Sequence, residues 1–576
     1  MKTRNSERSL RRLKVLGLAL LVWAIILAGR LVQLQVLGHD RFRAEVIEQN
    51  QNIRTVPPLR GTIYDRRGEI LARSLPVQSV FLSPSDKETP EVQCRALDRL
   101  SGILALSREE KDRIEARIRK RERFIYVKRK IDDDDAEAVE ALHLPSVFLQ
   151  EETKRFYTQG RLAAHVLGYV DIDEKGRHGV EKVFNEALSG VSGQSLILRD
   201  AHRRAYHLEV LKRAVPGRDL ELTIDQNIQY IAQKILARAV ESHRASWGTV
   251  VVSHPGTGEI LALASYPDFD PNQAAAPSEA EPNRAISVIF EPGSTFKIVT
   301  AATALDNGAV KVEDRFDCSE GAVALSGNFV RDHKPFGILS FSEVLSRSSN
   351  VGMIQVGRRL DRWNFYAAMK AFGFGETSGI SLPGEVRGII HPPAEWGTNG
   401  QAYQSIGYGV SVTAVQVLQA INIIANDGVL FPPRIVRNAA GTPAAGGKSV
   451  VPAPIAREIN AILRGVVEEG TGTMARIPGY PIAGKTGTTQ KWDGALRRYS
   501  SARHLASFAG FVDTQPAAFS MVVVIDDPQG DDQYGGLVAA PVFREIAHWL
   551  LLYRRIPPVP IASRVLTADL GSGGRR

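Results

Sequence analysis

The sequence predicts an α+β protein with one N-terminal transmembrane helix followed by two larger domains. Three observations lead to this prediction. A basic flank precedes an uncharged apolar run near the N-terminus, charged helical stretches alternate with short strand-like runs up to about residue 216, and the remaining chain has strand-like runs at both ends with helices between them. Strands at both ends of a domain suggest a layered α+β fold whose sheet joins its first and last segments. A chain of 576 residues has room for this arrangement.

The N-terminal segment predicts a membrane anchor. An uncharged run, VLGLALLVWAIILAG, occupies residues 15–29, and LVQLQVL continues it at helical spacing after Arg30. Cations in the preceding segment favour retention of that end in the cytoplasm; they are Arg4, Arg8, Arg11, Arg12 and Lys14. We therefore expect a basic cytoplasmic tail at 1–14 and a single-pass signal anchor at 15–37. A cleaved signal peptide is the alternative, because the uncharged run is shorter than the ~20 residues that a span needs, but its best cleavage site, at Ala28, is a poor match.

Residues 38–216 predict a first domain of mixed helices and strands. The stretch at 107–123 interleaves opposite charges, as a solvent-exposed helix does. The stretch at 132–142 begins with consecutive aspartates, which suit a helix N-terminus. Both helices are expected to be structural.

Residues 217–560 predict the second domain. The stretch at 247–265 suggests two strands around a Pro-Gly-Thr-Gly turn, which is a β-hairpin. The further elements expected are helices at 295–307, 342–357 and 540–553, a buried strand at 518–526 and a Gly/Ala/Pro-rich surface loop at 438–454. The tail at 561–576 ends in GSGGRR and is expected to be disordered.

Charge and cysteine content exclude several classes of protein. The formal net charge is +9, but no compact Lys/Arg block occurs in the body of the chain, so we expect no nucleic-acid partner. Cys94 and Cys318 lie far apart in different predicted domains, which excludes a disulfide framework and a cysteine-based zinc site. We expect both thiols to be unpaired, with a single bridge between them as the alternative in an oxidising compartment.

The motif S-x-x-K occurs once in the chain, with Ser294 and Lys297 at its ends. Pro-Gly precedes the serine and the helix expected at 295–307 follows it, so Ser294 is expected at a helix N-terminus, where the dipole favours developing negative charge. Lys297 would lie one turn further on the same face. A lysine can deprotonate a serine only if burial or nearby cations keep it neutral. Taken alone, the motif also fits a serine N-cap followed by an exposed lysine.

The second motif is S-x-N, with Ser348 and Asn350 at its ends, after the helix-like stretch SFSEVLSR. Its hydroxyl can relay a proton, and its amide can donate and accept hydrogen bonds at once. Another S-x-N occurs at 326–328, so the pattern alone is weak. The alternative is a polar connection between two helices.

The third motif is K-T-G-T, formed by Lys485, Thr486, Gly487 and Thr488 within PIAGKTGTT. On an edge strand, a lysine and two hydroxyls can hold a substrate carboxylate. Gly487 would remove a side chain that obstructs the substrate backbone. The alternative is a Gly-rich turn.

In this order, the three motifs resemble those of penicillin-binding proteins and serine β-lactamases. The chain is similar to class B penicillin-binding proteins over nearly its full length, in RGTIYDRRG (60–68), KRFYTQGRLAAHVLGYV (154–170), GVE (179–181) and NRAISVIFEPGSTFK (283–297). Thr158 departs from the family, which usually has proline after the tyrosine. SIGYGVSVT (405–413) and YGGLVAAPVF (534–543) look most like the division-specific, FtsI-like members.

The resemblance implies a fold and a function. At 217–560 it implies a transpeptidase domain with an antiparallel sheet flanked by helices, like that of serine β-lactamases, and at 38–216 an elongated α+β pedestal, or dimerisation, domain. The chain would be a peptidoglycan D,D-transpeptidase of the bacterial cytoplasmic membrane, with its catalytic domain on the periplasmic side. Stem peptides of lipid II-derived glycan would be its substrates and β-lactam antibiotics would acylate it. A SEDS-type glycosyltransferase and other divisome membrane proteins would be partners, and no metal or other cofactor is required.

The resemblance also implies how the acyl-enzyme forms. Neutral Lys297 would take the proton of Ser294 as the serine attacks the penultimate D-Ala carbonyl of a pentapeptide stem. The backbone N–H groups of Ser294 and Thr488 would form the oxyanion hole, which is usually the largest electrostatic contribution in acyl transfer.

The remaining motif residues would handle the second proton and the substrate. Ser348 would relay the proton to the departing D-Ala, while Asn350 holds the substrate amide and orients the lysine of the first motif. Lys485, Thr486 and Thr488 would bind the terminal carboxylate, and the amine of a neighbouring stem would then attack the acyl-enzyme.

Rival functions fit the sequence less well. A β-lactamase or D,D-carboxypeptidase would release the acyl-enzyme to water, but the anchor and the long first domain are not needed for hydrolysis, and no E-x-x-L-N stretch could supply a deacylating glutamate. A class A penicillin-binding protein would need the E-D-x-x-F motif of a glycosyltransferase domain. A β-lactam sensor would need several spans, and a non-catalytic scaffold would be expected to lose one of the motifs. Elongation- and sporulation-specific class B transpeptidases are the alternatives within the family.

Overall fold

The computed structural model describes residues 3–33, 51–83, 88–122, 124–199, 205–273, 280, 282–325, 328–437, 446–495, 498–530 and 532–559. The chain divides into two compact units, residues 1–59 with 190–216 and residues 60–189 with 217–576. The tail expected at 561–576 lies outside the described residues.

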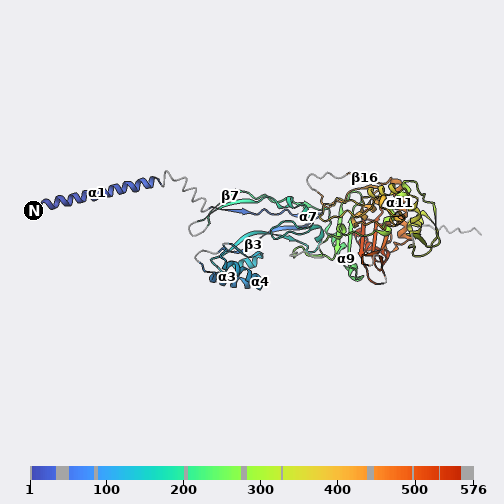
Figure 1. Cartoon of the computed structure of the whole chain (residues 1–576), viewed down its shortest axis with the longest axis horizontal. Coiled ribbons are helices and arrows are strands. Elements are labelled where there is room, and N and C mark those ends of the chain that lie inside the picture. Colours follow the sequence, from blue (N-terminus) through green and yellow to red (C-terminus); the bar gives the residue numbers. More distant parts are fainter. Residues whose placement is uncertain are drawn as a thin grey trace, which may run out of the picture. The chain divides into compact units, whose positions relative to one another are not determined.

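The first unit contains the predicted anchor helix and a small sheet. Helix α1 (Thr3–Val32) is continuous, and its segment from Lys14 to Val32 is apolar and long enough to span a membrane (Figure 1). This candidate span overlaps the anchor expected at 15–37, whose last residues lie outside the described ones. The sheet is antiparallel, with β6 (Gly193–Arg199) between β1 (Gln51–Val56) and β7 (Ala205–Lys212).

The N-terminal part of the second unit is an α+β body built on a twisted sheet in the order β4-β3-β2-β8, with β5 also paired to β3. The strands are β2 (Ile63–Tyr64), β3 (Ile70–Leu82), β4 (Ile125–Ile131), β5 (Val147–Tyr157) and β8 (Leu220–Glu221). Helices α3 (Pro90–Ile103), α4 (Arg108–Arg119) and α5 (Asp133–Glu140) pack with β3 and β4 around one apolar core. The structure thus confirms the helices predicted within 107–123 and 132–142, and a capping box between Ser107 and Glu110 begins the first of them.

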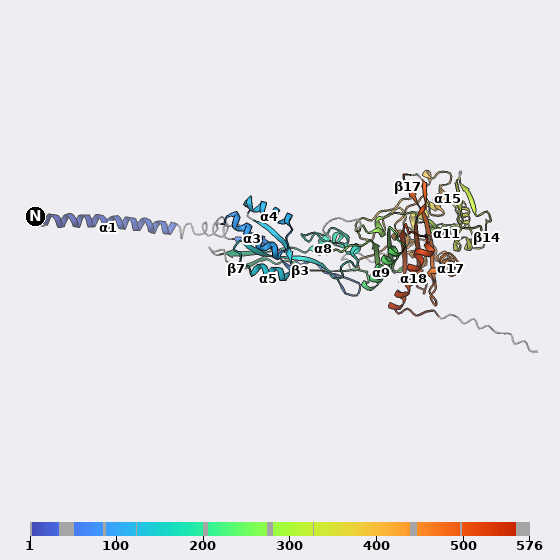
Figure 2. The same ribbon diagram turned by 90° about the horizontal axis from the view of Figure 1, so that it is seen from below.

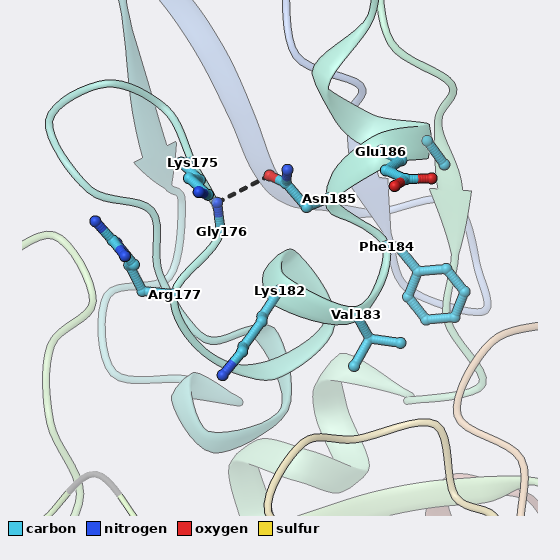
Figure 3. A pocket seen from close by; sticks show the side chains of 9 residues that line it. Lys175, Gly176, Arg177, Lys182, Val183, Phe184, Asn185 and Glu186 are labelled. Atoms are coloured by element: carbon cyan, nitrogen blue, oxygen red, sulfur yellow. Dashed lines mark hydrogen bonds between the residues drawn. The ribbon is translucent and has the colours of Figure 1, made fainter.

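A buried ion cluster holds the short helices that follow this sheet. The Glu181 carboxylate accepts hydrogen bonds from Arg60 Nε and Arg155 Nε, both at 2.6 Å, and all three side chains are buried. Asn185 Oδ1 accepts from Arg60 Nη1 at 3.0 Å and from the Gly176 N–H at 2.9 Å. The second of these bonds lies at a cavity of about 720 Å³ lined by residues 175–177 and 182–187 (Figure 3).

The C-terminal part of the second unit is built on a five-stranded antiparallel sheet in the order β10-β9-β19-β18-β17. The strands are β9 (Trp247–Ser253), β10 (Ile260–Tyr266), β17 (Ile482–Asp493), β18 (Arg498–Val512) and β19 (Ser520–Asp526). The predicted hairpin at 247–265 and the predicted strand at 518–526 are both confirmed, and they pair with each other through β9 and β19. The α+β fold class is confirmed, with the sheet joining the first and last segments of this body.

Helices cover both faces of this sheet. Val250 and Val252 of β9 pack with α9 (Gln226–Ser242) and α18 (Gly535–Tyr553). Val251, which points the other way, belongs to the core formed with α11 (Lys297–Asp306), α16 (Ala414–Ala425) and α17 (Ala453–Glu468). Figure 2 shows α11 and α17 together beside the sheet, with α9 and α18 next to each other. Although α18 is apolar enough to span a membrane, 56% of its most apolar stretch is buried, as expected of a core helix.

The other elements are short. They are α6 (Ala164–Leu167), α7 (Gly179–Val183), α8 (Asn185–Ser189), α10 (Arg284–Ser287), η2 (Gly293–Phe296), β11 (Arg315–Cys318), β12 (Ala322–Leu325), β13 (Asn328–Arg331), β14 (Gly337–Ser340), α12 (Phe341–Ser346), α13 (Asn350–Arg358), α14 (Arg362–Ala371), η3 (Pro393–Glu395), α15 (Gly400–Gln404), β15 (Val429–Leu430), β16 (Lys448–Ser449) and η4 (Thr473–Ala475).

Three predicted elements differ from the structure in their limits. The helix expected at 342–357 is two helices, α12 and α13, separated at the S-x-N motif. Of the loop expected at 438–454, residues 438–445 lie outside the described ones, residues 448–449 form β16, and the end belongs to α17. The helix expected at 540–553 begins five residues earlier, at Gly535, and Pro541 lies inside it.

Candidate active site

Ser294 lies in the 3₁₀ turn η2, which leads directly into α11. The serine is thus near a helix start, as the sequence predicts, although the α-helix begins at Lys297 and not at residue 295. Its side chain is half-buried, and no hydrogen bond joins its hydroxyl to another of the described residues. The turn depends on Gly293, whose φ of +54° is left-handed and whose Cβ, if present, would lie 2.3 Å from Thr489 Cγ2. The serine is therefore held at the start of a helix, close against strand β17.

Lys297 begins α11 and is fully buried. Its Nζ donates to the Ser348 carbonyl oxygen and to Asn350 Oδ1, each at 2.7 Å, and lies 3.4 Å from Ser348 Oγ. Burial lowers the pKa of Lys297 to about 7, and the Asp332 carboxylate opposes this shift. The structure thus brings the S-x-x-K and S-x-N motifs together and supplies the burial that a neutral lysine requires.

The S-x-N motif forms a strained break between two helices. Ser348 has a φ of +60°, which is uncommon for a residue with a Cβ and costs about 1–2 kcal/mol. Ser349 then acts as the N-cap of α13, accepting from the Gly352 N–H at 3.0 Å. This break directs the Ser348 carbonyl and the Asn350 side chain at the Lys297 amine. The strained residue therefore lies within the candidate site.

Asp332 organises this break and was not singled out from the sequence. Its carboxylate accepts from Ser349 Oγ at 2.6 Å, from the Val351 N–H at 3.2 Å and from the Asn350 N–H. Cys318 Sγ lies 3.4 Å from the same Ser349 hydroxyl. Asp332 satisfies orphan N–H groups at the start of α13 from a segment 17 residues upstream, and no local sequence pattern marks such a long-range cap.

Lys485 lies on β17, which is an edge strand of the sheet, and is fully buried. Its Nζ donates to Ser348 Oγ at 2.8 Å and to the Thr486 carbonyl oxygen at 3.3 Å. Burial and the neighbouring Lys297 amine lower the pKa of Lys485 well below its usual range. The sequence predicts that Lys485 anchors a substrate carboxylate by its charge. In the structure the same amine also holds the Ser348 hydroxyl of the S-x-N motif.

The threonines of the third motif have partners outside it. The Thr486 hydroxyl hydrogen-bonds the Thr471 hydroxyl at 2.7 Å, and Thr488 Oγ1 accepts from the Gly535 N–H at 2.9 Å. Thr471 and Gly535 therefore fix the two hydroxyls, and neither was singled out as a site residue from the sequence.

Gly487 is also required by the packing of the protein itself. A Cβ at this position would lie 2.4 Å from Ser507 Oγ and 3.0 Å from both the Pro292 carbonyl oxygen and Thr295 Cγ2. These atoms belong to β18 and to the serine turn. The glycine is therefore required where β17 packs directly on that turn, and its clearance for a substrate stays a prediction.

Residues 479–486 also fit the spacing of a phosphate-binding loop, G-x-x-x-x-G-K-T. That loop must wrap a phosphate and lead into a helix. Here Lys485 and Thr486 lie inside an extended strand and the lysine is buried against Ser348, so the geometry excludes a phosphate loop. Within the described part of the chain, no group of three or more His, Cys, Asp or Glu side chains is placed to hold a metal ion.

A five-stranded sheet flanked by helices, with a serine turn, a buried lysine and a K-T-G-T edge strand, defines a serine-type penicillin-binding transpeptidase domain. The family model of the penicillin-binding protein transpeptidase domain matches residues 248–548, and that of the penicillin-binding protein dimerisation domain matches residues 55–222. The chain belongs to the class B penicillin-binding proteins and is a peptidoglycan D,D-transpeptidase.

Named relatives and solved structures cover most of the chain. Peptidoglycan D,D-transpeptidase FtsI of Escherichia coli K12 is 32% identical over 569 residues, which is 97% of this chain and 95% of that protein. Stage V sporulation protein D of Bacillus subtilis is 33% identical over 85% of this chain and 77% of its own length. The crystal structure of penicillin-binding protein 3 of Mycobacterium tuberculosis complexed with ampicillin has a TM-score of 0.69 at 27% identity, and covers 88% of this chain and 98% of that one.

Proposed function

We propose that this transpeptidase cross-links stem peptides through an acyl-enzyme on Ser294, with Lys297 as the base. The observation that carries the proposal is the environment of the lysine amine. A neutral amine has two N–H bonds, and the Ser348 carbonyl and Asn350 Oδ1 accept hydrogen bonds from Nζ at 2.7 Å. The lone pair of this amine is then free to accept the proton of Ser294. Because the pKa of Lys297 is about 7, a large fraction of the lysine is neutral at neutral pH.

The proposed reaction proceeds in two acyl transfers. Ser294 Oγ bonds to the penultimate D-Ala carbonyl carbon while its proton passes to Lys297, and the backbone N–H groups of Ser294 and Thr488 hold the oxyanion. The C–N bond to the terminal D-Ala then breaks, and the departing amine takes a proton through Ser348. The amine of a neighbouring stem next attacks the acyl carbonyl carbon and loses its proton to Lys297. The C–O bond to Ser294 then breaks, and Ser294 Oγ takes that proton from Lys297.

The remaining motif residues are proposed to bind the donor peptide. Thr486 and Thr488 would hold the terminal carboxylate, with Lys485 beneath them contacting Ser348, while Asn350 binds the substrate amide and Gly487 keeps the strand against the serine turn. A carboxylate arriving beside Lys485 would favour its charged form, since an opposite charge stabilises an ammonium. Lys485 would then serve both the carboxylate and the proton relay.

Labelling with a fluorescent penicillin tests the nucleophile. The full-length protein in detergent is incubated with the reagent, and the rate of covalent labelling is compared with that of Ser294→Ala and of Ser501→Ala, an exposed serine on β18 that serves as the matched control. Labelling should vanish in the first variant and persist in the second. Equal labelling of Ser294→Ala would refute the assignment. Formation of cross-linked dimer from stem pentapeptides, rather than release of free tetrapeptide alone, separates transpeptidation from carboxypeptidase or β-lactamase activity.

The domain limits and the topology are also proposals. The chain would have a cytoplasmic tail at 1–14, an anchor at 15–37, a pedestal at 38–216 and a transpeptidase domain at 217–560, with the catalytic domain on the periplasmic side of the cytoplasmic membrane. The apolar segment of α1, which follows a basic N-terminal stretch, supports this orientation. Protease added to spheroplasts should digest the body of the chain, and protection of the body would contradict this topology.

The cellular role proposed is septal wall synthesis, with a SEDS-type glycosyltransferase and other divisome membrane proteins as partners. Its support is the similarity to FtsI over nearly the full length of both chains. The similarity to stage V sporulation protein D favours a sporulation role as the second candidate. A functional fluorescent fusion in growing cells distinguishes them: midcell rings are expected, whereas dispersed sidewall spots would indicate elongation and a signal confined to sporulating cells would indicate sporulation.

A further inference from the structure

Glu291 lies three residues before Ser294, in a segment held from two sides. Phe290 and Val412 exchange two backbone hydrogen bonds, at 3.0 and 2.9 Å, and the Gly293 N–H donates to the Gly407 carbonyl oxygen at 3.1 Å. These bonds join the segment to the loop before α16. On the opposite side, Thr489 Oγ1 of β17 donates to the Glu291 carbonyl oxygen at 3.1 Å. The turn that carries the serine thus lies between a loop and the edge strand.

The Glu291 side chain ties the same two regions together through one atom. Its Oε1 accepts from the Gly409 N–H at 2.8 Å and from the Tyr499 hydroxyl at 3.0 Å. Burial raises the pKa of this carboxyl group, and the two hydrogen bonds oppose the rise. Gly409 belongs to the loop before α16, whereas Tyr499 lies on β18, so the carboxyl group bridges segments that are 90 residues apart in sequence.

Aromatic packing extends this link to the end of the β17–β18 hairpin. The Tyr499 ring meets the rings of Tyr408 and Trp492 edge-on, at centroid distances of 5.4 and 5.3 Å. Trp492 is also the cross-strand partner of Tyr499. Tyr408 lies in the loop before α16, and Trp492 lies on β17. The ring of Tyr499 therefore links that loop to the β17–β18 hairpin, as its hydroxyl does.

This arrangement fixes the distance between the two groups proposed to form the oxyanion hole. One N–H group belongs to Ser294, on the turn, and the other to Thr488, on β17. We propose that Glu291 is a positioning residue of this enzyme, which holds the serine turn in register with β17 by binding Gly409 and Tyr499 at once. The inference rests on the proposed role of Ser294. It matters because a displacement of about 1 Å between reacting groups can cost about 100-fold in rate.

The test measures acylation of the full-length protein by a fluorescent penicillin over a range of concentrations, which separates the first-order acylation rate from the apparent dissociation constant. Glu291→Ala should slow the first-order step by about 100-fold with little change in apparent affinity, since the geometry of attack is what it loses. Tyr499→Phe keeps the ring and removes one donor, so it should slow the step by about 10-fold. Glu291→Gln keeps an acceptor oxygen and should recover most of the rate lost in Glu291→Ala.

Two controls separate this proposal from its alternatives. Tyr230→Phe removes the hydroxyl of an exposed tyrosine on α9 and should change nothing. The melting temperature of each variant shows whether a lost rate only follows lost folded protein. The proposal is overturned if Glu291→Ala acylates within threefold of the wild-type rate, if the loss appears in affinity instead of rate, if it equals the unfolded fraction, or if Glu291→Gln is as slow as Glu291→Ala. Labelling of Ser294→Ala would instead overturn the assignment of the nucleophile.

Discussion

Two regions of this chain bury cations, and they do so with opposite consequences. In the pedestal, Arg60 and Arg155 each contact one oxygen of the Glu181 carboxylate at 2.6 Å. In the transpeptidase site, Lys297 and Lys485 are equally buried, but their hydrogen-bond acceptors are carbonyl, amide and hydroxyl oxygens. The first cluster compensates its charge with a carboxylate in direct contact. The second contains two neighbouring amines and no such contact, so its pKa values fall.

The difference shows how a fold separates structural from reactive cations. An arginine cannot lose its proton in a protein, so a buried arginine needs a carboxylate partner. A lysine can lose its proton, and burial without a partner makes it a base at neutral pH. The choice of residue and the choice of partner together decide whether the group stabilises the fold or carries out chemistry. Replacing either the buried cation or the carboxylate that faces it tests this difference.

Replacing Lys297 by methionine should have the largest effect on chemistry. It removes the base, so acylation by penicillin should fall by about 10²–10⁴-fold. The same change should raise the free energy of unfolding by about 1–2 kcal/mol near pH 7, because it removes the cost of burying an ionisable amine in the core. The unfolded lysine titrates near 10.5 and the folded one near 7, so the unfolded state holds more protons between these values and wild-type stability rises with pH across that window. The stability gain of the variant should therefore shrink from pH 7 to pH 10.

Labelling kinetics and thermal unfolding check this prediction, with Lys311→Met, at an exposed lysine, as the matched control. A variant that loses both activity and stability would mean that the buried lysine also supports the fold, and the contrast with the pedestal would fail.

Replacing Glu181 by glutamine should have the opposite effect, a loss of stability with no loss of chemistry. It leaves two buried arginines without their carboxylate, and breaking a buried ion pair costs about 3–5 kcal/mol. The melting temperature of the full-length protein should fall, while the acylation rate per folded molecule at a permissive temperature stays unchanged. Glu186→Gln, at the exposed rim of the neighbouring cavity, is the matched control and should behave as wild type. An unchanged melting temperature would show that the charge of Glu181 does not support the pedestal.

Sequence reasoning found the residues that the structure brings together in the candidate site, but not the residues that hold them. The three motifs identified Ser294, Lys297, Ser348 and Lys485 because each has a fixed local spacing, and the hairpin at 247–265 was visible from its turn chemistry. The break in the helix expected at 342–357 was foreseen only as the alternative interpretation of S-x-N, because the left-handed serine there is held by contacts from distant segments.

The residues that were missed act across long sequence separations. Asp332, Thr471 and Gly535 each fix a motif residue from another element, and none lies in a pattern that periodicity or capping rules detect. The packing role of Gly487 was missed for the same reason, because the atoms that a Cβ would meet come from β18 and from the serine turn. Local spacing predicts which groups meet in the candidate site, whereas tertiary packing decides how each is held.

Replacing Lys485 by alanine tests whether the second buried amine is also a base. If it anchors a carboxylate, the loss of a charge-assisted hydrogen bond of about 1.5–3 kcal/mol should slow penicillin acylation by about 10–150-fold. A small acylating agent without a carboxylate should be nearly unaffected. Lys297→Ala should slow both reagents, because it removes the proton acceptor itself. Equal impairment of both reagents by Lys485→Ala would place Lys485 in proton transfer, through its 2.8 Å contact with Ser348.

Replacing Asp332 by asparagine should give the smallest change, and it tests the comparison most directly. Asp332 is the carboxylate that raises the pKa of Lys297 against the effect of burial. In the wild type, acylation needs the neutral amine, so the rate should rise about tenfold between pH 6 and pH 8 around a midpoint near pH 7. Asparagine keeps an acceptor oxygen for the N–H groups of α13 but removes the negative charge. The pKa of Lys297 should then fall further, and the midpoint of the profile should move to lower pH by less than about one unit.

The rate on the alkaline plateau separates the electrostatic role of Asp332 from its role as a cap. Losing part of the cap costs about 1 kcal/mol, so the plateau rate should fall by less than about tenfold. Labelling rates measured from pH 5.5 to 9 report the midpoint and the plateau independently. A lower plateau with an unmoved midpoint would make Asp332 a cap alone. A midpoint that moves upward would mean that Lys297 is held neutral by something other than burial, because removing a nearby negative charge can only favour the neutral amine.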